Sequence, residues 1–391
     1  MITVAQALSG VLDLLAPLPT EVIPLAEAAG RTLAEDAVAK RQQPPFASSA
    51  MDGYAVISAD LRTGVKLQVI GEAAAGSAYE GAITSGQCTR IFTGAPVPTG
   101  ADRILIQEDT TRDGDVITVS DNIDTSVYIR PAGGDFTVGT RVSAPRVLRA
   151  SDIALLASMN IAEVTVRRKP QIALVATGDE LVMPGENPAA SQIVSSNNFG
   201  LKALIEAHGA VGRILPIARD TEASLKGVMD LAASADLIVT LGGASVGDHD
   251  LVSKVAGLEL DFYKVAMRPG KPLMAGKYGA VPMLGLPGNP VSTMVCGQVF
   301  LIPAINAMLG LGKAALPREA ASLGCDLPAN GPRSHFMRAE LALKEGVLTC
   351  TPFDRQDSSL LSVLARANCL MVRSPNEVAK KAGDSVEFIR I

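Results

Sequence analysis

The sequence predicts a multidomain fold of α/β plus β type: a central α/β domain with a parallel sheet, an inserted mostly β domain, helical segments and a small C-terminal β-barrel. Three observations carry this prediction. The chain has 391 residues, more than one ordinary domain holds. Apolar strands alternate with amphipathic helices from residue 171 to about residue 312, as in parallel sheets that helices cover on both faces. Short β-branched runs, broken by Gly, Pro and Asp, dominate residues 44–139 and 313–391.

Composition indicates a globular protein without a nucleic-acid or membrane partner. Hydrophobic residues make up 48% of the chain and charged residues 19%, which allows large buried cores. The 40 acidic side chains outnumber the 35 basic ones, and no basic run could follow a nucleic-acid backbone. No apolar run reaches the roughly 20 residues of a membrane-spanning helix, and the first residues lack a signal-peptide pattern. We therefore expect a cytoplasmic protein.

Cysteine and histidine are too scattered to form a metal centre. The five cysteines never form a Cys-x-x-Cys pair, and we interpret them as reduced packing residues. The three histidines, His208, His249 and His335, are isolated from one another. Any metal ion would therefore be held by carboxylates or phosphate oxygens, and such ligands suit Mg²⁺.

Helical signals flank the inserted β domain. Thr3 and Gln6 form a capping-box pattern ahead of apolar residues at helical spacing. A second helix is predicted for Glu21–Ala29, ending at Gly30, and a third for Ile153–Met159. The predicted domains are a helical, linking domain of residues 1–43 and 140–170, the inserted β domain of residues 44–139, the α/β domain of residues 171–312 and the barrel of residues 313–391.

The α/β domain and the barrel are predicted element by element. The elements of the α/β domain are strand Ile172–Ala176, helix Asn198–His208, strand Arg213–Ile217, helix Glu222–Ala233 and strand Leu237–Leu241. The predicted barrel strands are His335–Leu343, Val347–Pro352 and Cys369–Arg373.

Candidate binding residues lie in the loops beyond the predicted strands. In parallel sheets, ligands bind beyond the carboxyl ends of the strands. Here these ends are Ala176, Leu241 and Leu284. In the loop Gly242–Asp250, Gly243 lets backbone amides approach an anion and Ser245 can donate a hydrogen bond. This loop is predicted to cradle a phosphate, with a tight glycine turn without a ligand as the alternative.

Two further segments favour an anion. Asn289 fits a helix N-cap and Pro290 fits the first helical position, so the free amides of a helix start would face a ligand. The binding candidates of this segment are Pro287, Asn289, Pro290 and Ser292. Three cations also fall within one short segment; they are Lys264, Arg268 and Lys271. A plain helix start and a solvated strand edge are the alternatives.

Other nucleotide and hydrolase motifs are absent or incomplete. Residues 243–247 match the Gly-x-Ser-x-Gly pattern of serine hydrolases. A hydrolase needs a downstream histidine, but His249 is too near in sequence and His335 falls in the predicted barrel. The chain has neither a Gly-x-Gly-x-x-Gly dinucleotide loop nor a Gly-x-x-x-x-Gly-Lys-Ser/Thr phosphate loop. Asp52 and Asp135 stand beside glycines and, taken alone, fit turns.

Short motifs follow one another in order along nearly the whole chain. They are Pro44–Phe46, Ser49–Val56, Arg90–Ala95, Gly100–Asp102, Gly134–Asp135, Thr177–Leu181, Ser196–Asn197, Gly242–Asp250, Arg268–Pro272 and Leu286–Ser292. Together they resemble the molybdopterin molybdenumtransferase family, known as MoeA in bacteria and as the E domain of gephyrin in animals. So long an ordered set is very specific.

The resemblance implies a four-domain subunit in an elongated homodimer. The active-site cleft would lie between the α/β, molybdopterin-binding domain of one subunit and the inserted β domain of the other. The substrates would be adenylylated molybdopterin and molybdate, and a molybdopterin adenylyltransferase would be the donor partner. The adenylate would be hydrolysed with Mg²⁺ or another divalent cation, AMP would be released and molybdenum would stay on the dithiolene.

The resemblance also associates particular positions with activity. They are Asp52, Thr93, Asp135, Glu180, Asp220, Asp250, Lys264 and Arg268, with Pro287 and Pro290 on the proline loop of the family. We hypothesise that Asp220, Asp250 and Glu180 hold the divalent cation. Asp52 and Asp135 would position water or coordinate metal across the dimer interface. Gly243, Ser245 and the helix start would hold phosphate, while Lys264, Arg268 and Lys271 would attract oxyanions.

The sequence departs from the family pattern at a few positions. Ala47, Ser48 and Ser195 replace residues that are more polar or acidic in many members, which affects fine substrate contacts rather than the reaction class. Arg268 replaces a lysine of some members but keeps the charge. Two other functions are considered: a molybdopterin adenylyltransferase would not need the inserted β domain, and a non-catalytic anchor would need an additional linker or module.

Overall fold

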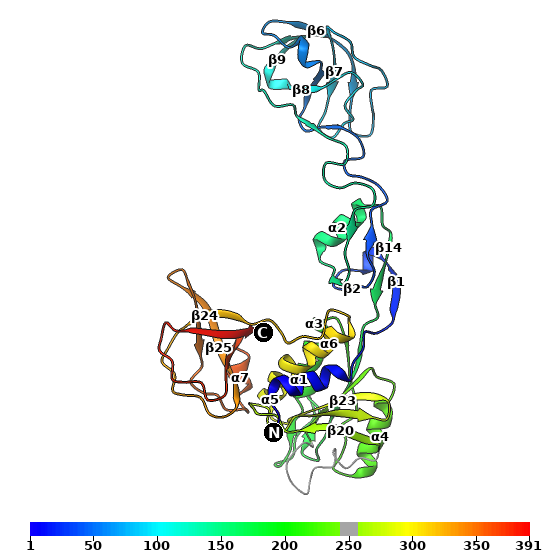
Figure 1. The fold of residues 1–391 in the computed structure, drawn as a ribbon. Helices are drawn as coiled ribbons and strands as arrows, with labels where there is room; N and C mark the ends of the chain where they lie inside the picture. The colour runs from blue at the N-terminus through cyan, green and yellow to red at the C-terminus, as the bar shows by residue number, and fades with distance from the viewer. Residues whose placement is uncertain (243–256) are drawn as a thin grey trace.

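The computed structural model describes residues 1–242 and 257–391, and the fold is elongated (Figure 1). A mostly β domain forms one end, a narrow sheet follows it, and the α/β domain and the C-terminal barrel form the other end. The multidomain α/β plus β class predicted from the sequence is confirmed. The exact domain boundaries stay a prediction.

Helix α1 (Val4–Asp13) begins at the predicted capping box. The Thr3 hydroxyl accepts a hydrogen bond from the Gln6 amide at 3.2 Å, and the Gln6 side chain accepts one from the Thr3 amide at 2.9 Å. The buried face of α1, with Leu8 and Val11, belongs to the main core of the α/β domain. This helix was predicted to belong to the linking domain. Its apolar face packs against the α/β domain instead.

The linking region is a sheet with one helix. The prediction of a helix at Glu21–Ala29 is wrong, because this segment forms β1 (Thr20–Pro24) and a short 3₁₀ turn. Strand β1 pairs antiparallel along its whole length with β14 (Glu163–Arg167), and this tertiary pairing overrides the local helical pattern. The sheet order is β1-β14-β2-β13, with β2 at Thr32–Leu33 and β13 at Arg146–Val147. Helix α2 (Ala150–Ser158) supplies the predicted third helix.

The inserted domain is built on a six-stranded sheet of order β8-β5-β7-β6-β10-β9. Its strands are β5 (Gly53–Val56), β6 (Lys66–Ala73), β7 (Gln87–Ile91), β8 (Arg103–Ile106), β9 (Thr110–Asp113) and β10 (Val116–Val119). Short pairs join it to the rest: β4 (Ser48–Ser49) with β11 (Ile129–Arg130), and β3 (Ala37–Val38) with β12 (Arg141–Val142). The sheet has its own small core.

The central sheet of the α/β domain has the order β18-β15-β19-β23-β22-β20. Its strands are β15 (Gln171–Ala176), β18 (Val211–Ile214), β19 (Leu237–Leu241), β20 (Leu258–Tyr263), β22 (Met274–Tyr278) and β23 (Val281–Leu286). The first four strands are parallel, as predicted. The last two pairings, β23 with β22 and β22 with β20, are antiparallel, because β22 runs against the other strands after a hairpin turn that places Gly279 at a φ of 57°. The sheet is therefore mixed.

Helices complete the α/β domain. Helices α3 (Asn197–Ala207) and α4 (Glu222–Ala232) match the predicted helices within a residue or two. Helix α5 (Pro290–Cys296), a π-helical stretch at Gly297–Leu301 and α6 (Ile302–Met308) run on as one helix. This helix is long and apolar enough to cross a membrane, but 83% of its most apolar window is buried inside the protein. It is therefore a core helix.

The predicted C-terminal β-barrel is confirmed. Its strands are β24 (Glu319–Leu323), β25 (Ser334–Lys344), β26 (Val347–Pro352), β27 (Cys369–Arg373) and β28 (Ser385–Arg390), and the β25–β27 pairing closes the ring. The barrel is joined to the α/β domain by β21 (Met267–Arg268), which pairs with β25. The short helix α7 (Leu361–Leu364) follows β26.

Candidate functional site

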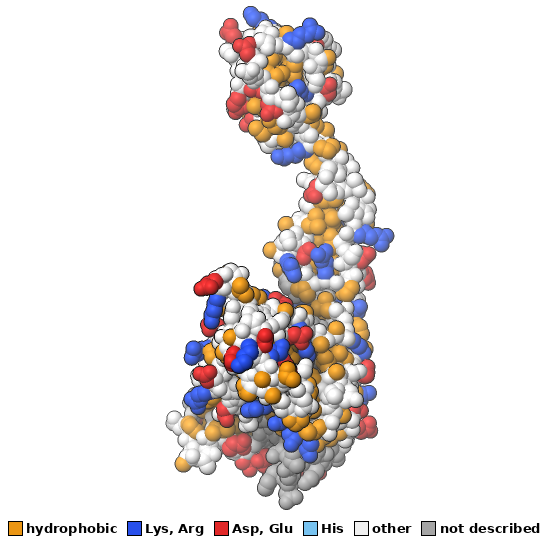
Figure 2. Space-filling model, turned by 60° about the vertical axis from the view of Figure 1, so that its left-hand side comes forward, with side chains coloured by type: hydrophobic (Ala, Val, Ile, Leu, Met, Phe, Trp, Pro, Cys, Tyr) orange, Lys and Arg blue, Asp and Glu red, His pale blue; other side chains and the backbone are white. Residues whose placement is uncertain are grey.

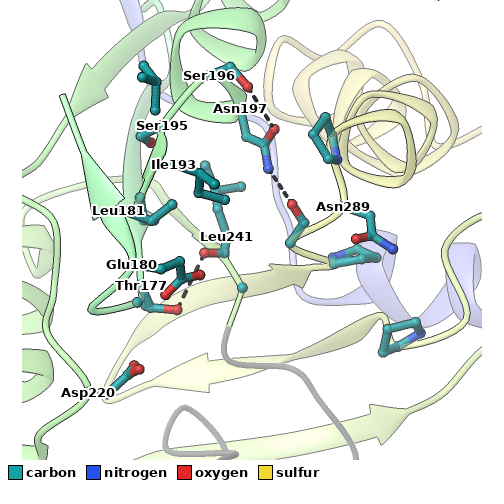
Figure 3. A pocket seen from close by; sticks show the side chains of 18 residues that line it. Thr177, Glu180, Leu181, Ile193, Ser195, Ser196, Asn197, Asp220, Leu241 and Asn289 are labelled. Atoms are coloured by element: carbon teal, nitrogen blue, oxygen red, sulfur yellow. Dashed lines mark hydrogen bonds between the residues drawn. The ribbon is translucent and has the colours of Figure 1, made fainter. Parts of the chain in front are cut away.

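A cavity of about 470 Å³ lies beyond the carboxyl ends of β15, β19 and β23 (Figure 3). The three loops that follow these strands line it, as the sequence predicts for ligand binding in such a sheet. The loops are also joined to one another. The Thr177 amide donates to the Leu241 carbonyl at 3.1 Å, and the Gly242 amide donates to the Leu286 carbonyl at 3.2 Å.

Gly242 is held in a conformation that requires glycine. Its φ is 91°, and a Cβ added there would lie 3.1 Å from both the carbonyl and the hydroxyl oxygen of Thr177. The backbone of the central loop therefore passes close beside the first loop. The predicted phosphate cradle continues from this point, but Gly243, Ser245 and Asp250 lie outside the described residues.

Two predicted carboxylates line the cavity. Glu180 follows β15 and Asp220 precedes α4, and both side chains are exposed (Figure 3). Two hydrogen bonds join the loops that carry them. The Asp220 amide donates to the Asp179 carboxylate at 3.1 Å, and the Asp179 amide donates to the Asp220 carboxylate at 3.4 Å. Carboxylate oxygens at a solvent-filled cavity are the donor type that Mg²⁺ prefers. Within the described part of the chain, no group of three potential metal ligands is assembled.

The predicted helix start forms the wall opposite these carboxylates. Asn289 occupies the N-cap position of α5 and Pro290 the first helical position, as predicted. However, the Asn289 side chain does not cap the helix; its amide donates instead to the Ser358 hydroxyl at 3.1 Å. The Val291 amide donates to the Ser358 carbonyl at 3.0 Å. A loop of the C-terminal barrel therefore supplies the hydrogen-bond acceptor for an amide at the start of α5, where the Asn289 side chain was expected to supply one.

Lys264, Arg268 and Lys271 lie on the loop between β20 and β22, with Arg268 in its short strand β21, but none of them lines the cavity, which only Pro272 reaches from this segment. The loop is closed at its base, because the Val265 amide donates to the Lys271 carbonyl at 3.0 Å. Lys264 is half-buried with a φ of 77°, and its Nζ lies 4.9 Å from the centre of the Tyr263 ring.

A group of cationic side chains surrounds His335 next to this loop. His335 in β25 pairs with Arg268 in β21 and is 8% exposed. Burial lowers the pKa of His335 to about 4, and the charges of Arg268, Arg338 and two further arginines lower it in the same direction. A buried imidazole held neutral here is consistent with strong local positive potential.

Asp52 is hydrogen-bonded within the inserted domain. Its Oδ1 accepts from the Thr93 amide and from the Thr93 hydroxyl, each at 2.7 Å. These two bonds, in that order of importance, and the nearby Arg90 charge hold the pKa of Asp52 below its usual value. Asp135 is exposed, and its amide donates to the Gln43 carbonyl at 2.9 Å.

Known proteins match the chain over its whole length. Residues 2–160 match the MoeA N-terminal region (domain I and II), residues 173–307 a probable molybdopterin binding domain, and residues 320–391 the MoeA C-terminal region (domain IV). A molybdopterin molybdenumtransferase of Haemophilus influenzae is 34% identical to it, over 99% of this chain and 98% of that protein. The chain belongs to the molybdopterin molybdenumtransferase family.

Further members of the family support this conclusion. A molybdopterin molybdenumtransferase of Nostoc is 33% identical over 95% of this chain and 89% of that protein. The crystal structure of the molybdopterin biosynthesis MoeA protein from Pyrococcus horikoshii OT3 covers both chains completely, with 26% identity and a TM-score of 0.85. The resemblance inferred from the motifs is confirmed, and the chain is a transferase of this family.

The residues that the family motifs single out do not all meet in one chain. Those that line the cavity are Glu180, Asp220, Pro287, Asn289 and Pro290. Those that do not are Asp52, Thr93, Asp135, Lys264, Arg268, Lys271 and Ser292, the last of which is buried in α5. Asp52 and Thr93 flank β5 and β7 of the inserted domain, and Figure 1 shows that domain at the opposite end of the chain from β23 and α5.

Sequence reasoning did not select the polar residues that shape the cavity wall. Asn197 opens α3, and its side-chain amide donates to the Gly288 carbonyl at 2.7 Å (Figure 3). Thr293 is completely buried below the same loop. Asn197 could have been found, because it belongs to a matched motif at the start of a predicted helix. For Thr293 the sequence holds no comparable signal.

We expect the pKa of Asp52 to rise in Thr93→Val, because one of its two hydrogen-bond donors is lost. It should remain below the usual aspartate value, since the amide donor of residue 93 is retained. Thr93→Ser keeps the hydroxyl and should leave the pKa unchanged. Titration of the carboxyl carbon of Asp52 by NMR measures this, and equal pKa values in all three proteins would contradict the interpretation.

Acid should destabilise the folded chain partly through His335. Because its folded pKa of about 4 lies below the usual 6.5, the unfolded chain binds more protons between these values, so stability is lost as the pH falls from 6.5 to 4. His335→Gln should flatten the slope of unfolding free energy against pH in this window, by at most about 1.4 kcal/mol per pH unit. His208→Gln is the matched control. Parallel slopes for wild type and His335→Gln would exclude the effect.

Proposed function

We propose that this protein acts in molybdenum cofactor biosynthesis by inserting molybdenum from molybdate into adenylylated molybdopterin. The adenylate is hydrolysed with Mg²⁺, and AMP and the molybdenum cofactor are released. The observation that carries this proposal is the similarity to molybdopterin molybdenumtransferases over 99% of the chain. A cavity at the carboxyl ends of the parallel strands, lined by Glu180 and Asp220, supports it. We place the protein in the cytoplasm.

The proposed active site needs two subunits. Asp52 has its pKa lowered by Thr93 but lies in the domain farthest from the cavity of its own chain. In a homodimer, the inserted domain of one subunit would reach the cavity of the other. Exposed valines on the linking strands offer an apolar surface for such contacts; Val22, Val38 and Val147 are 64%, 42% and 43% exposed. Figure 2 shows hydrophobic side chains along this narrow part of the molecule.

The proposed chemistry is divided between the cavity of one subunit and the inserted domain of the other. Glu180 and Asp220, with Asp250, would hold Mg²⁺, which when bound polarises the scissile phosphoryl group. Lys264, Arg268 and Lys271 would draw oxyanions towards the site by long-range attraction, because they do not line the cavity. Asp52 and Asp135 of the partner would orient water for cleavage of the phosphoanhydride bond.

Two alternative functions are weaker. A serine hydrolase would use His335 as its base, but this histidine is buried among arginines with a pKa of about 4. A molybdopterin adenylyltransferase would need only the α/β domain, whereas the family match includes residues 2–160 and 320–391. We propose such an adenylyltransferase as the partner that donates the substrate.

The reaction is tested directly with purified protein, adenylylated molybdopterin, Mg²⁺ and molybdate, by measuring AMP. AMP release should require molybdate and stop when EDTA removes the divalent cation. Asp52→Asn and Asp220→Asn should each lower the rate about 100-fold or more. Asp230→Asn, on the exposed face of α4 and paired with Lys226, is the matched control. Absence of molybdate-stimulated AMP release by wild type would refute the proposed reaction.

The two-subunit site is tested by mixing the inactive variants. After subunit exchange, a heterodimer of Asp52→Asn and Asp220→Asn has one site with both changes and one site with neither. Random mixing should therefore restore about a quarter of the wild-type activity. If each site were built from one subunit, the mixture would stay as inactive as the separate variants.

A further inference from the structure

We propose that Thr293, a buried residue of α5, is a positioning residue for the cavity wall at residues 287–289. It holds this backbone so that the carbonyl oxygens of the wall are hydrogen-bonded to donors of the protein. The inference rests on the proposed function, because it concerns how that cavity accepts an anionic substrate. Thr293 has no exposed surface, so its side chain cannot touch a ligand itself. Its effect must pass through the backbone that it holds.

Three consecutive carbonyl groups of the wall are engaged by side chains. The Thr293 hydroxyl lies 2.5 Å from the Pro287 carbonyl oxygen and 3.1 Å from that of Asn289. The carbonyl between them, that of Gly288, accepts from the Asn197 side-chain amide at 2.7 Å (Figure 3). The same amide donates to the Thr293 hydroxyl at 3.2 Å. The Asn289 carbonyl also accepts from the Thr293 backbone amide at 2.9 Å, so Thr293 and Asn197 together engage all three carbonyl groups.

This arrangement suits an anion at the cavity. A free carbonyl oxygen would present a partial negative charge to a phosphate or molybdate oxygen and would weaken binding. Pro287 and Pro290 have no amide hydrogen to donate within the turn, and the carbonyls of Pro287 and Gly288 take their donors from the side chains of Thr293 and Asn197. Because each carbonyl is already hydrogen-bonded to a donor of the protein, the cost of placing negative charge beside this wall is lower.

The wall is fixed on its other side as well. The Asn289 side chain and the Val291 amide bind the barrel residue Ser358 at 3.1 and 3.0 Å. Loss of the Thr293 hydroxyl would therefore not displace α5, which stays attached to the barrel and packed in the core. The expected defect is local: the Pro287 carbonyl loses its donor and turns towards water in the cavity, while the Asn289 carbonyl keeps the amide of residue 293.

Thr293→Val removes the hydroxyl with little change of shape. With adenylylated molybdopterin and molybdate, we expect KM for the pterin substrate to rise about tenfold while kcat changes less than twofold, because no reacting atom is touched. Thr293→Ser keeps a hydroxyl and should restore KM. Thr240→Val is the matched control: Thr240 is equally buried in the same domain, but its hydroxyl has no partner among the described residues.

Hydrogen exchange of the peptide that spans residues 286–293 tests the positioning without any reaction. Exchange should be faster in Thr293→Val than in wild type, Thr293→Ser and Thr240→Val. Unchanged exchange in Thr293→Val overturns the positioning role even if wild type is inactive in the AMP assay. With an active wild type, equal KM values for Thr293→Val and Thr240→Val, or a loss confined to kcat, overturn it while the proposed function stands.

Discussion

The start of α5 depends on contacts from three parts of the chain. Asn197 reaches it from α3, Thr293 from its own first turn and Ser358 from the C-terminal barrel. Asn289 is exposed at the cavity, but α5 is buried from Val291 onward, and its first polar groups need partners because unpaired polar groups are costly away from water. The wall of the cavity is therefore set by long-range hydrogen bonds. The barrel, which contributes no residue to the cavity lining in the described chain, still supports it.

Most of the α/β domain and the barrel could be predicted because their patterns are local. The buried strand at Ile172–Ala176 and the amphipathic helix at Glu222–Ala233 can each be recognised from the spacing of their apolar residues and from their composition. The segment Glu21–Ala29 could not be predicted, because its strand exists only through pairing with β14, more than a hundred residues later. Helix α1 was predicted correctly as a helix, but an apolar stripe does not say which core will receive it.

The candidate site was predictable where topology decides it. The rule that ligands bind beyond the carboxyl ends of parallel strands located the cavity, and Glu180, Asp220 and Pro287 line it. Spacing alone could not say that Lys264 and Lys271 would be held outside the lining, since that follows from the closed base of their loop. Spacing also could not show that Asn289 would bind Ser358 instead of capping α5, because that partner lies in another domain.

The inserted domain carries an acidic group that is prepared before any partner arrives. Moving an ionised carboxylate into a partly dry interface costs free energy unless hydrogen bonds replace its water. The amide and hydroxyl of Thr93 already bind Asp52, and the two residues flank paired strands of one small sheet, so they would move together into a dimer. Asp52 would then meet the other subunit's cavity as an anion whose charge is offset by its own domain. A carboxylate set up in this way keeps its hydrogen-bond donors when water is removed, whereas one that relied on a partner for its donors would lose water before it gained them. The local hydrogen bonds of Asp52 thus make half of the proposed site independent of the other half.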